Sequence, residues 1–181
     1  YIDSADFDGD GKIDIAIQDY SAGKIHVLQN TTTTSTINFT YITSLSTGGS
    51  AEGLDIGDFN QDGLLDILAA NYSYNSIAIF RNNSTIGSLS FTTAQNLSSQ
   101  GNTTALVMGD IDGDGVSDLV TTPWSSGGIK TFLNTTTSGG NTFTYSTPTI
   151  TSVSSNPWGA ELADLDSDGD LDLIITSGGI R

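Results

Sequence analysis

The sequence has no cysteine, only three prolines and only five lysine or arginine residues. The absence of cysteine excludes a disulfide framework and thiolate metal sites. Because 21 acidic residues give a net charge of -16, a phosphate backbone would be repelled, which excludes a nucleic acid partner. No apolar run approaches the roughly 20 residues needed to span a bilayer, so we expect no membrane insertion.

The chain also lacks a signal-like segment at its start, Tyr1, and we therefore expect a processed or excised piece. Its hydrophobic share of 36% is adequate for a β-rich domain of 181 residues. The acids are strongly clustered, since all but Asp3, Asp19, Glu52, Asp55 and Glu161 fall in four short loops. This clustering indicates a local function for the acids rather than bulk solubility.

A repeat organises the chain. Asp6, Asp58 and Asp110 are 52 residues apart, and Asp164 follows after 54. Two further sets keep the 52-residue spacing, namely Asn30, Asn82 and Asn134, and Phe39, Phe91 and Phe143. A period of this length is typical of repeat architectures. It divides a single segment, 1–181, into repeats of about 1–49, 50–101, 102–155 and 156–181, the last one incomplete.

Each period has the pattern of four short strands, because β-branched or alternating stretches are separated by Gly, Asn, Ser and Asp. In the second period these strands are predicted at 54–59, 65–70, 76–81 and 89–94. The sequence therefore predicts an all-β fold of β-propeller blades, each a four-stranded antiparallel sheet. A β-sandwich or a parallel β-helix is the alternative, but neither repeats its sequence at this period.

The number of predicted blades is about three and a half, from a first strand at 2–7 to an interrupted third strand at 179–181. Such an array does not close a ring and leaves open edges, which favour pairing. We therefore expect either continuation of the same chain or self-association of copies.

The four acidic loops share the pattern D-x-[DN]-x-D-G-x-x-D, and Ca²⁺ prefers six to eight oxygen ligands of this kind. We expect about four calcium ions, each bound by side chains at loop positions 1, 3, 5 and 9 and by the backbone carbonyl of position 7. The predicted ligands are Asp6, Asp8, Asp10, Lys12 and Asp14; Asp58, Asn60, Asp62, Leu64 and Asp66; Asp110, Asp112, Asp114, Val116 and Asp118; and Asp164, Asp166, Asp168, Asp170 and Asp172.

The loops have three alternative interpretations, namely an EF-hand, a magnesium site and a metal-free turn. An EF-hand would add a glutamate at position 12, where the chain has Ile17, Ala69, Thr121 and Ile175. Mg²⁺ is less suitable because it demands a small regular octahedron. A metal-free Asp-Gly turn remains possible, although crowded carboxylates repel one another without a cation. By charge count the second loop, with Asn60, should bind most weakly.

With these loops between consecutive strands, the chain resembles the FG-GAP/VCBS repeats, the blades of integrin-α-type β-propellers. The resemblance covers the whole chain and implies Ca²⁺ in the loop between strands one and two of each blade. A Phe-Gly…Gly-Ala-Pro signature is not evident, which favours the VCBS-like bacterial branch. Members of this group serve in adhesion, surface assembly and ligand binding, and as modules attached to enzymes.

The chain is also rich in N-x-[ST] sequons, which accept N-linked glycans in secreted proteins. The alternative is that Asn and Thr are simply good turn and strand residues of a repeat. The eight candidate sites are Asn30, Asn38, Asn71, Asn82, Asn83, Asn96, Asn102 and Asn134.

Catalysis has little support in the sequence, because His26 is the only histidine and no nucleophile–base set is evident, so we expect no enzyme. Trp124 and Trp158 each follow a proline and could stack on sugars or pack on a propeller face. We expect an extracellular, calcium-binding structural or adhesive glycoprotein that assembles into a larger surface structure or filament. The alternatives are a carbohydrate-binding, lectin-like propeller and a non-catalytic module of a secreted enzyme.

Overall fold

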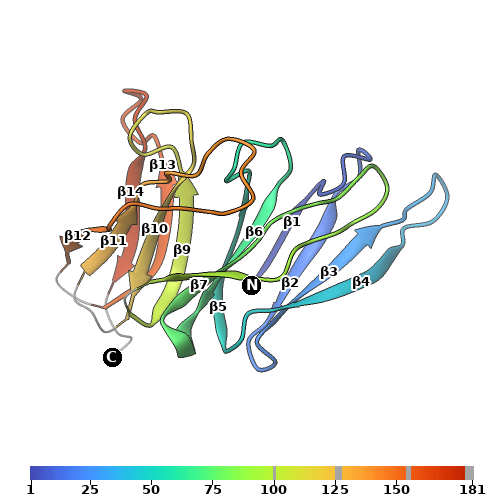
Figure 1. Ribbon diagram of the computed structural model, residues 1–181, viewed down its shortest axis with the longest axis horizontal. Helices are drawn as coiled ribbons and strands as arrows, with labels where there is room; N and C mark the ends of the chain where they lie inside the picture. Colours follow the sequence, from blue (N-terminus) through green and yellow to red (C-terminus); the bar gives the residue numbers. More distant parts are fainter. Residues whose placement is uncertain (100, 125–127, 154–155, 178–181) are drawn as a thin grey trace.

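The computed structural model describes residues 1–99, 101–124, 128–153 and 156–177, and the sheets in this part of the chain lie side by side (Figure 1). Blade 1 comprises β1 (Ile2–Ala5), β2 (Asp14–Asp19), β3 (Lys24–Asn30) and β4 (Phe39–Ser46). Blade 2 comprises β5 (Ala51–Gly57), β6 (Asp66–Asn71), β7 (Ser76–Phe80) and β8 (Gln95–Ser98). Blade 3 comprises β9 (Thr103–Gly109), β10 (Asp118–Pro123), β11 (Gly128–Phe132) and β12 (Thr149–Ser152), and β13 (Pro157–Ala163) and β14 (Asp172–Ser177) form a two-stranded sheet, which we call blade 4.

Within each blade the strands pair antiparallel with their neighbours in sequence, as in β1-β2-β3-β4. This confirms the all-β fold of four-stranded blades. The described helical structure is a single 3-10 turn, η1 (Tyr72–Tyr74). No helix in the described part of the chain is long and apolar enough to cross a membrane.

The fourth strand of blade 2 differs from the prediction, since β8 is Gln95–Ser98 and not 89–94. Leu89 and Phe91 instead belong to a long connection that folds back, with an isolated bridge between Asn82 and Phe91. Both side chains pack against blade 1. The first strand ends at Ala5 rather than at residue 7, and the third strand predicted at 179–181 lies outside the described residues.

The hydrophobic core lies between the blades. One cluster joins blades 1 and 2 and includes Phe7, Ile25, Ile67 and Phe80. A second joins blades 2 and 3, and a third joins blade 3 to β13–β14. Strand β6 is buried along its whole length because its alternate side chains enter two different clusters. Blade packing therefore depends on both faces of each sheet.

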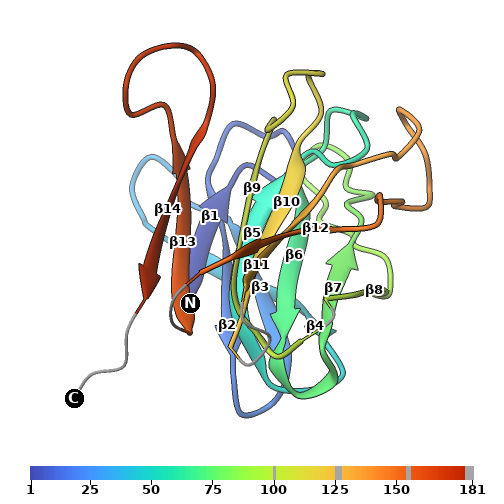
Figure 2. The same ribbon diagram turned by 90° about the vertical axis from the view of Figure 1, so that its left-hand side faces the viewer.

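Strands β1, β5, β9 and β13 are the first strands of their blades, and they line a common cavity of about 390 Å³. Figure 2 shows β13–β14 at one side of the molecule. Three acids, Asp3, Asp55 and Glu161, line this cavity. Asp55 bridges two blades by accepting a hydrogen bond at Oδ2 from the Met108 amide at 3.0 Å.

Candidate metal centres

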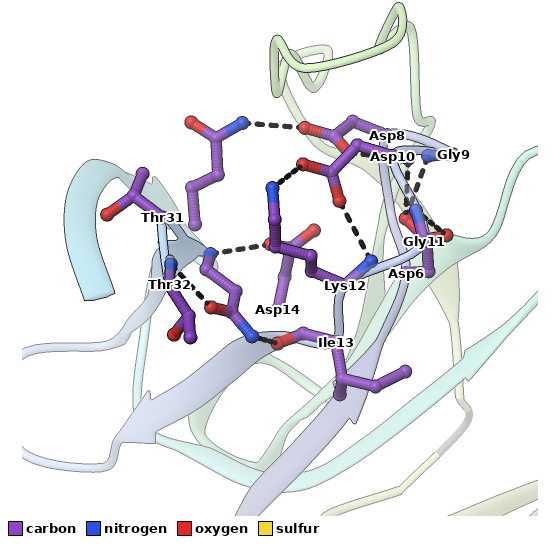
Figure 3. A network of polar contacts seen from close by, with 12 residues as sticks. Asp6, Asp8, Gly9, Asp10, Gly11, Lys12, Ile13, Asp14, Thr31 and Thr32 are labelled. Atoms are coloured by element: carbon purple, nitrogen blue, oxygen red, sulfur yellow. Dashed lines mark hydrogen bonds and ion pairs between the residues drawn. The ribbon is translucent and has the colours of Figure 1, made fainter. Parts of the chain in front are cut away.

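Each acidic loop folds around the aspartate at its first position. In loop one, Asp6 Oδ1 accepts hydrogen bonds from the amides of Gly9 at 2.8 Å and Asp10 at 3.1 Å, and Oδ2 accepts one from Gly11 at 2.9 Å (Figure 3). Gly11 has φ +84°, a left-handed conformation that favours glycine. The turn therefore wraps its amides around one carboxylate.

The same turn recurs in the other loops. Asp110 accepts bonds from Gly113, Asp114 and Gly115, Asp58 from Asp62 and Gly63, and Asp164 from Ser167 and Gly169. The position-6 glycines Gly63, Gly115 and Gly169 also have positive φ angles of +85°, +86° and +97°. Sequence identity at positions 1 and 6 thus corresponds to one backbone conformation in all four loops.

The acids at positions 3 and 5 are also fixed by loop amides. In loop one, Asp8 Oδ1 accepts from the Asp10 amide at 3.2 Å, and Asp10 Oδ1 accepts from the Lys12 amide at 2.9 Å. Equivalent bonds occur in each of the other loops. These bonds hold carboxylate oxygens close to one another despite their like charge.

Carboxylate oxygens converge in three of the loops. Oxygens of three acids lie within 4.8 Å of one another in each of the sets Asp6, Asp8 and Asp10; Asp110, Asp112 and Asp118; and Asp164, Asp166 and Asp172. A hard cation with oxygen ligands suits such a set. The structure thus brings together nine of the predicted ligands, three in each of these loops. The other predicted ligands stay predictions.

The position-9 acids Asp14, Asp66 and Asp118 are almost fully buried and accept two backbone hydrogen bonds each. Burial, with a smaller contribution from neighbouring loop acids, raises the pKa of Asp14 and Asp118 above the ordinary value and that of Asp66 to about 7. The backbone hydrogen bonds oppose this shift. A bound cation would favour the ionised form of these buried acids.

Loop two has an additional partner across the blade boundary. Asn60 is fully buried, and its Nδ2 donates to Asp62 Oδ2 and to the Gly140 carbonyl oxygen of blade 3, both at 2.9 Å. The Asn60 carbonyl in turn accepts from the Gly139 amide. The asparagine that lowers the charge of this loop therefore also attaches a blade 3 connection to it.

Cations of the chain lie beside two of the loops. Lys12 Nζ is 2.6 Å from Asp10 Oδ2, and Arg81 Nη1 is 3.9 Å from Asp62 Oδ2. The Lys12 hydrogen bond lowers the pKa of the half-buried Asp10 carboxyl. Both contacts offset part of the loop charge and would compete with a metal ion for the position-5 acids.

The periodic asparagines have a role that the sequence pattern did not suggest. Asn82 Nδ2 donates to the Leu65 carbonyl at 2.9 Å and, across the blade boundary, to the Phe7 carbonyl at 2.8 Å. In the next blade, Asn134 Nδ2 donates to the Ser117 and Phe59 carbonyls in the same way. Each asparagine thus attaches the acidic loop of its own blade to that of the preceding blade.

The phenylalanines at loop position 2 reinforce the same boundary. The rings of Phe7 and Phe91 pack edge to face with centroids 5.4 Å apart, and those of Phe59 and Phe143 do so at 6.1 Å. Phe7 and Phe59 are buried, although they lie in loops. The common 52-residue spacing of the asparagine and phenylalanine sets is the feature of the sequence from which these contacts could have been inferred.

Burial bears directly on the sequons. Asn71, Asn82 and Asn134 are buried, and Nδ2, the atom that would carry a glycan, donates to backbone carbonyls in all three. A glycan there would break these bonds and does not fit the closed blade boundary. Asn30 and Asn102 are half-buried and also donate from Nδ2, whereas Asn38, Asn83 and Asn96 are exposed.

The remaining candidate residues lie outside these loops. Trp124 and Trp158 meet edge to face with ring centroids 4.4 Å apart, and Trp158 is 48% exposed. His26 in β3 has Nε2 3.7 Å from Asp19 Oδ2 and packs near Tyr41. The tryptophans therefore contact one another rather than forming two separate platforms.

A family model described as an FG-GAP-like repeat matches residues 6–69, 58–121 and 118–175. No curated protein matches the chain. A solved structure that it resembles is the crystal structure of BBS1N in complex with ARL6DN, soaked with lead, with a TM-score of 0.54 and 17% identity. The similarity covers 98% of this chain but 53% of that one, so the chain spans about half its length, and at this identity it shows a propeller-like fold alone. These three matches extend from residue 6 to residue 175 and show that the chain belongs to the FG-GAP-like repeat family.

Proposed function

We propose that this chain is a non-catalytic, extracellular calcium-binding module with a structural or adhesive role, which holds about four Ca²⁺ ions and assembles into a larger surface structure or filament. The observation that carries the calcium proposal is the convergence of three acids within 4.8 Å in three separate loops. Backbone amides hold these acids in place by hydrogen bonds, so little ordering would accompany ion binding.

Because the loops lie at the blade boundaries, a bound ion would have a structural role. The second residue of loop one, Phe7, contributes its ring to the core between blades 1 and 2 and its carbonyl to Asn82. Phe59 does the same between blades 2 and 3. Calcium in these loops would therefore stabilise the blade boundaries as well as each blade, by linkage between binding and folding.

Isothermal titration of the chelator-treated chain with CaCl₂ tests this function. We expect about four ions per chain, and we expect Asp168→Asn to weaken one of the four sites by about tenfold, or about 1.4 kcal/mol, because position 5 supplies a ligand. Asp170→Asn is the matched control, since it removes the same charge from the same exposed loop but leaves the position-7 carbonyl. No calcium binding, or equal effects of the two substitutions, would contradict the proposal.

We propose N-linked glycosylation only for the exposed sequons, Asn38, Asn83 and Asn96. Peptide mass spectrometry of native material should find sugar at one or more of these positions and none at Asn82 or Asn134. The lectin-like alternative has a narrower basis, because the two tryptophans pack against each other. The secreted-enzyme module stays an alternative, which the coding sequence around this segment would test.

A further inference from the structure

Each internal blade boundary is built from the same two surfaces. Between blades 1 and 2, the earlier blade contributes Phe7 and Ala16, and the later blade contributes Ile67, Phe80 and Leu89. One period on, Phe59 and Leu68 meet Leu119 and Phe132 at the equivalent positions between blades 2 and 3, and Phe143, the equivalent of Phe91, packs with them. We call the first surface the loop face and the second the hairpin face.

The hairpin face of blade 1 is uncovered in the described structure. Its counterparts of Ile67 and Phe80 are Ile15 and Leu28, which are half-buried rather than buried. The difference in exposure is larger in the connection between the third and fourth strands, where Ile37 is 82% exposed and its counterpart Leu89 only 9%. Blade 1 therefore has the residues of a blade boundary without the opposing surface.

Asn30 lies beside this uncovered hairpin face and lacks one hydrogen bond that its counterpart Asn82 makes. Within the described chain, its Nδ2 donates only to the Ile13 carbonyl at 3.0 Å, the bond that matches Asn82 to Leu65. The second bond that Asn82 makes, to the loop carbonyl of the preceding blade, has no equivalent there. The donor and the apolar residues beside it thus fit a loop face.

An uncovered loop face lies at the other end, on blade 4. Leu165 occupies the position of Phe7 and is 63% exposed where Phe7 is 1% exposed. Ile174 in β14 occupies the position of Ala16 and is 41% exposed, whereas Ala16 is fully buried. Both halves of the boundary that the chain forms internally are therefore present, one at each end.

We propose that these end faces bind each other between copies of this chain, so that the loop face of one copy covers the hairpin face of the next, with Leu165 against Ile37 and the Leu165 carbonyl accepting from Asn30. We infer a second copy of this chain as the partner because the internal blade boundaries already pair a loop face with a hairpin face. The proposal rests on the assembly named above and specifies its surfaces. Because the two surfaces differ, the contact is head-to-tail and gives a ring or a filament.

Sedimentation velocity in saturating CaCl₂ tests the proposal with Ile37→Asp and Leu165→Asp, each of which buries a charge in the proposed contact. We expect concentration-dependent oligomers of the unmodified chain and monomers of each variant. An equimolar mixture of the two variants should form a heterodimer and nothing larger, because one intact loop face and one intact hairpin face remain. This mixing result also shows that both variants are folded.

Ile86→Asp is the matched control, since Ile86 is also 82% exposed but lies at the tip of a blade 2 connection, and it should assemble as the unmodified chain does. The proposal is overturned if the unmodified chain is a monomer at all concentrations, if either end variant assembles normally, or if the mixture stays monomeric. Calcium titration is independent of these outcomes, so failure of this contact and failure of the calcium proposal are distinguishable.

Discussion

Replacing Asn82 by alanine should destabilise the chain far more than the same change at Asn30, although both residues occupy the same position of the repeat. Asn82 Nδ2 donates to the carbonyls of Phe7 and Leu65, and Oδ1 accepts from the Ser84 amide at 2.8 Å. Asn82 itself is fully buried. Alanine would leave these three backbone groups without partners inside the protein.

The magnitude follows from those groups. A buried polar group left unsatisfied costs about 1–3 kcal/mol, so three groups with partial relaxation give about 3–5 kcal/mol for Asn82→Ala. Among the described residues, the Asn30 side chain makes only two local bonds, to the Ile13 carbonyl and from the Thr32 amide, and the residue is half-buried. Water can replace these bonds, so Asn30→Ala should cost about 1 kcal/mol.

Urea unfolding at fixed calcium concentration measures both free energies of unfolding, under dilution that keeps the chain monomeric. The difference between the two variants reports the contact across the blade boundary, because their local bonds are shared. Equal losses for the two variants, within about 0.5 kcal/mol, would refute the role of Asn82 as an inter-blade contact.

Two further predictions concern the blade boundaries. Phe59→Ala should lower the free energy of unfolding by about 3–5 kcal/mol, because it removes a fully buried ring and its contact with Phe143, whereas Ile86→Ala on the surface should change it by less than about 0.5 kcal/mol; urea unfolding checks both. Burial raises the pKa of Asp55 to about 6 from 3.8, so its folded form binds protons more readily than its unfolded form, and stability falls as pH rises through that window. Asp55→Asn should therefore stabilise the chain by about 2 kcal/mol at pH 8, a figure that allows for the loss of one backbone hydrogen bond, and should not stabilise it at pH 3.5. Melting curves of both proteins across this pH range check this, and a difference in stability that does not change with pH would contradict the reasoning.

The blade architecture could be predicted from the sequence because each blade repeats the same local pattern. The aspartate loops mark where β1 ends and β2 begins, and the glycine at position 6 fixes the turn in every copy. The convergence of acids in three of the loops followed from spacing alone, since the acids of one loop are at most eight positions apart. Local patterns of this kind need no knowledge of the tertiary structure.

The contacts between blades could not be predicted in the same way. Leu89 and Phe91 have the pattern of a strand, but packing against Phe7 places them in a connection, and β8 forms later from Gln95. Likewise, Asn82 matches a sequon, yet its neighbours are carbonyls up to 75 residues away. Strand patterns and sequons report local chemistry, whereas burial between repeats depends on long-range packing.

Thermal unfolding with and without calcium tests the central claim most directly. Binding to the folded state adds about 2.7 kcal/mol per site at a hundredfold excess over the dissociation constant, so several loops together should shift the melting temperature by many degrees. We predict that a chelator lowers the melting temperature of this chain and that excess CaCl₂ restores it, while MgCl₂ at the same concentration restores it less. Identical melting curves with chelator and with calcium would contradict the account.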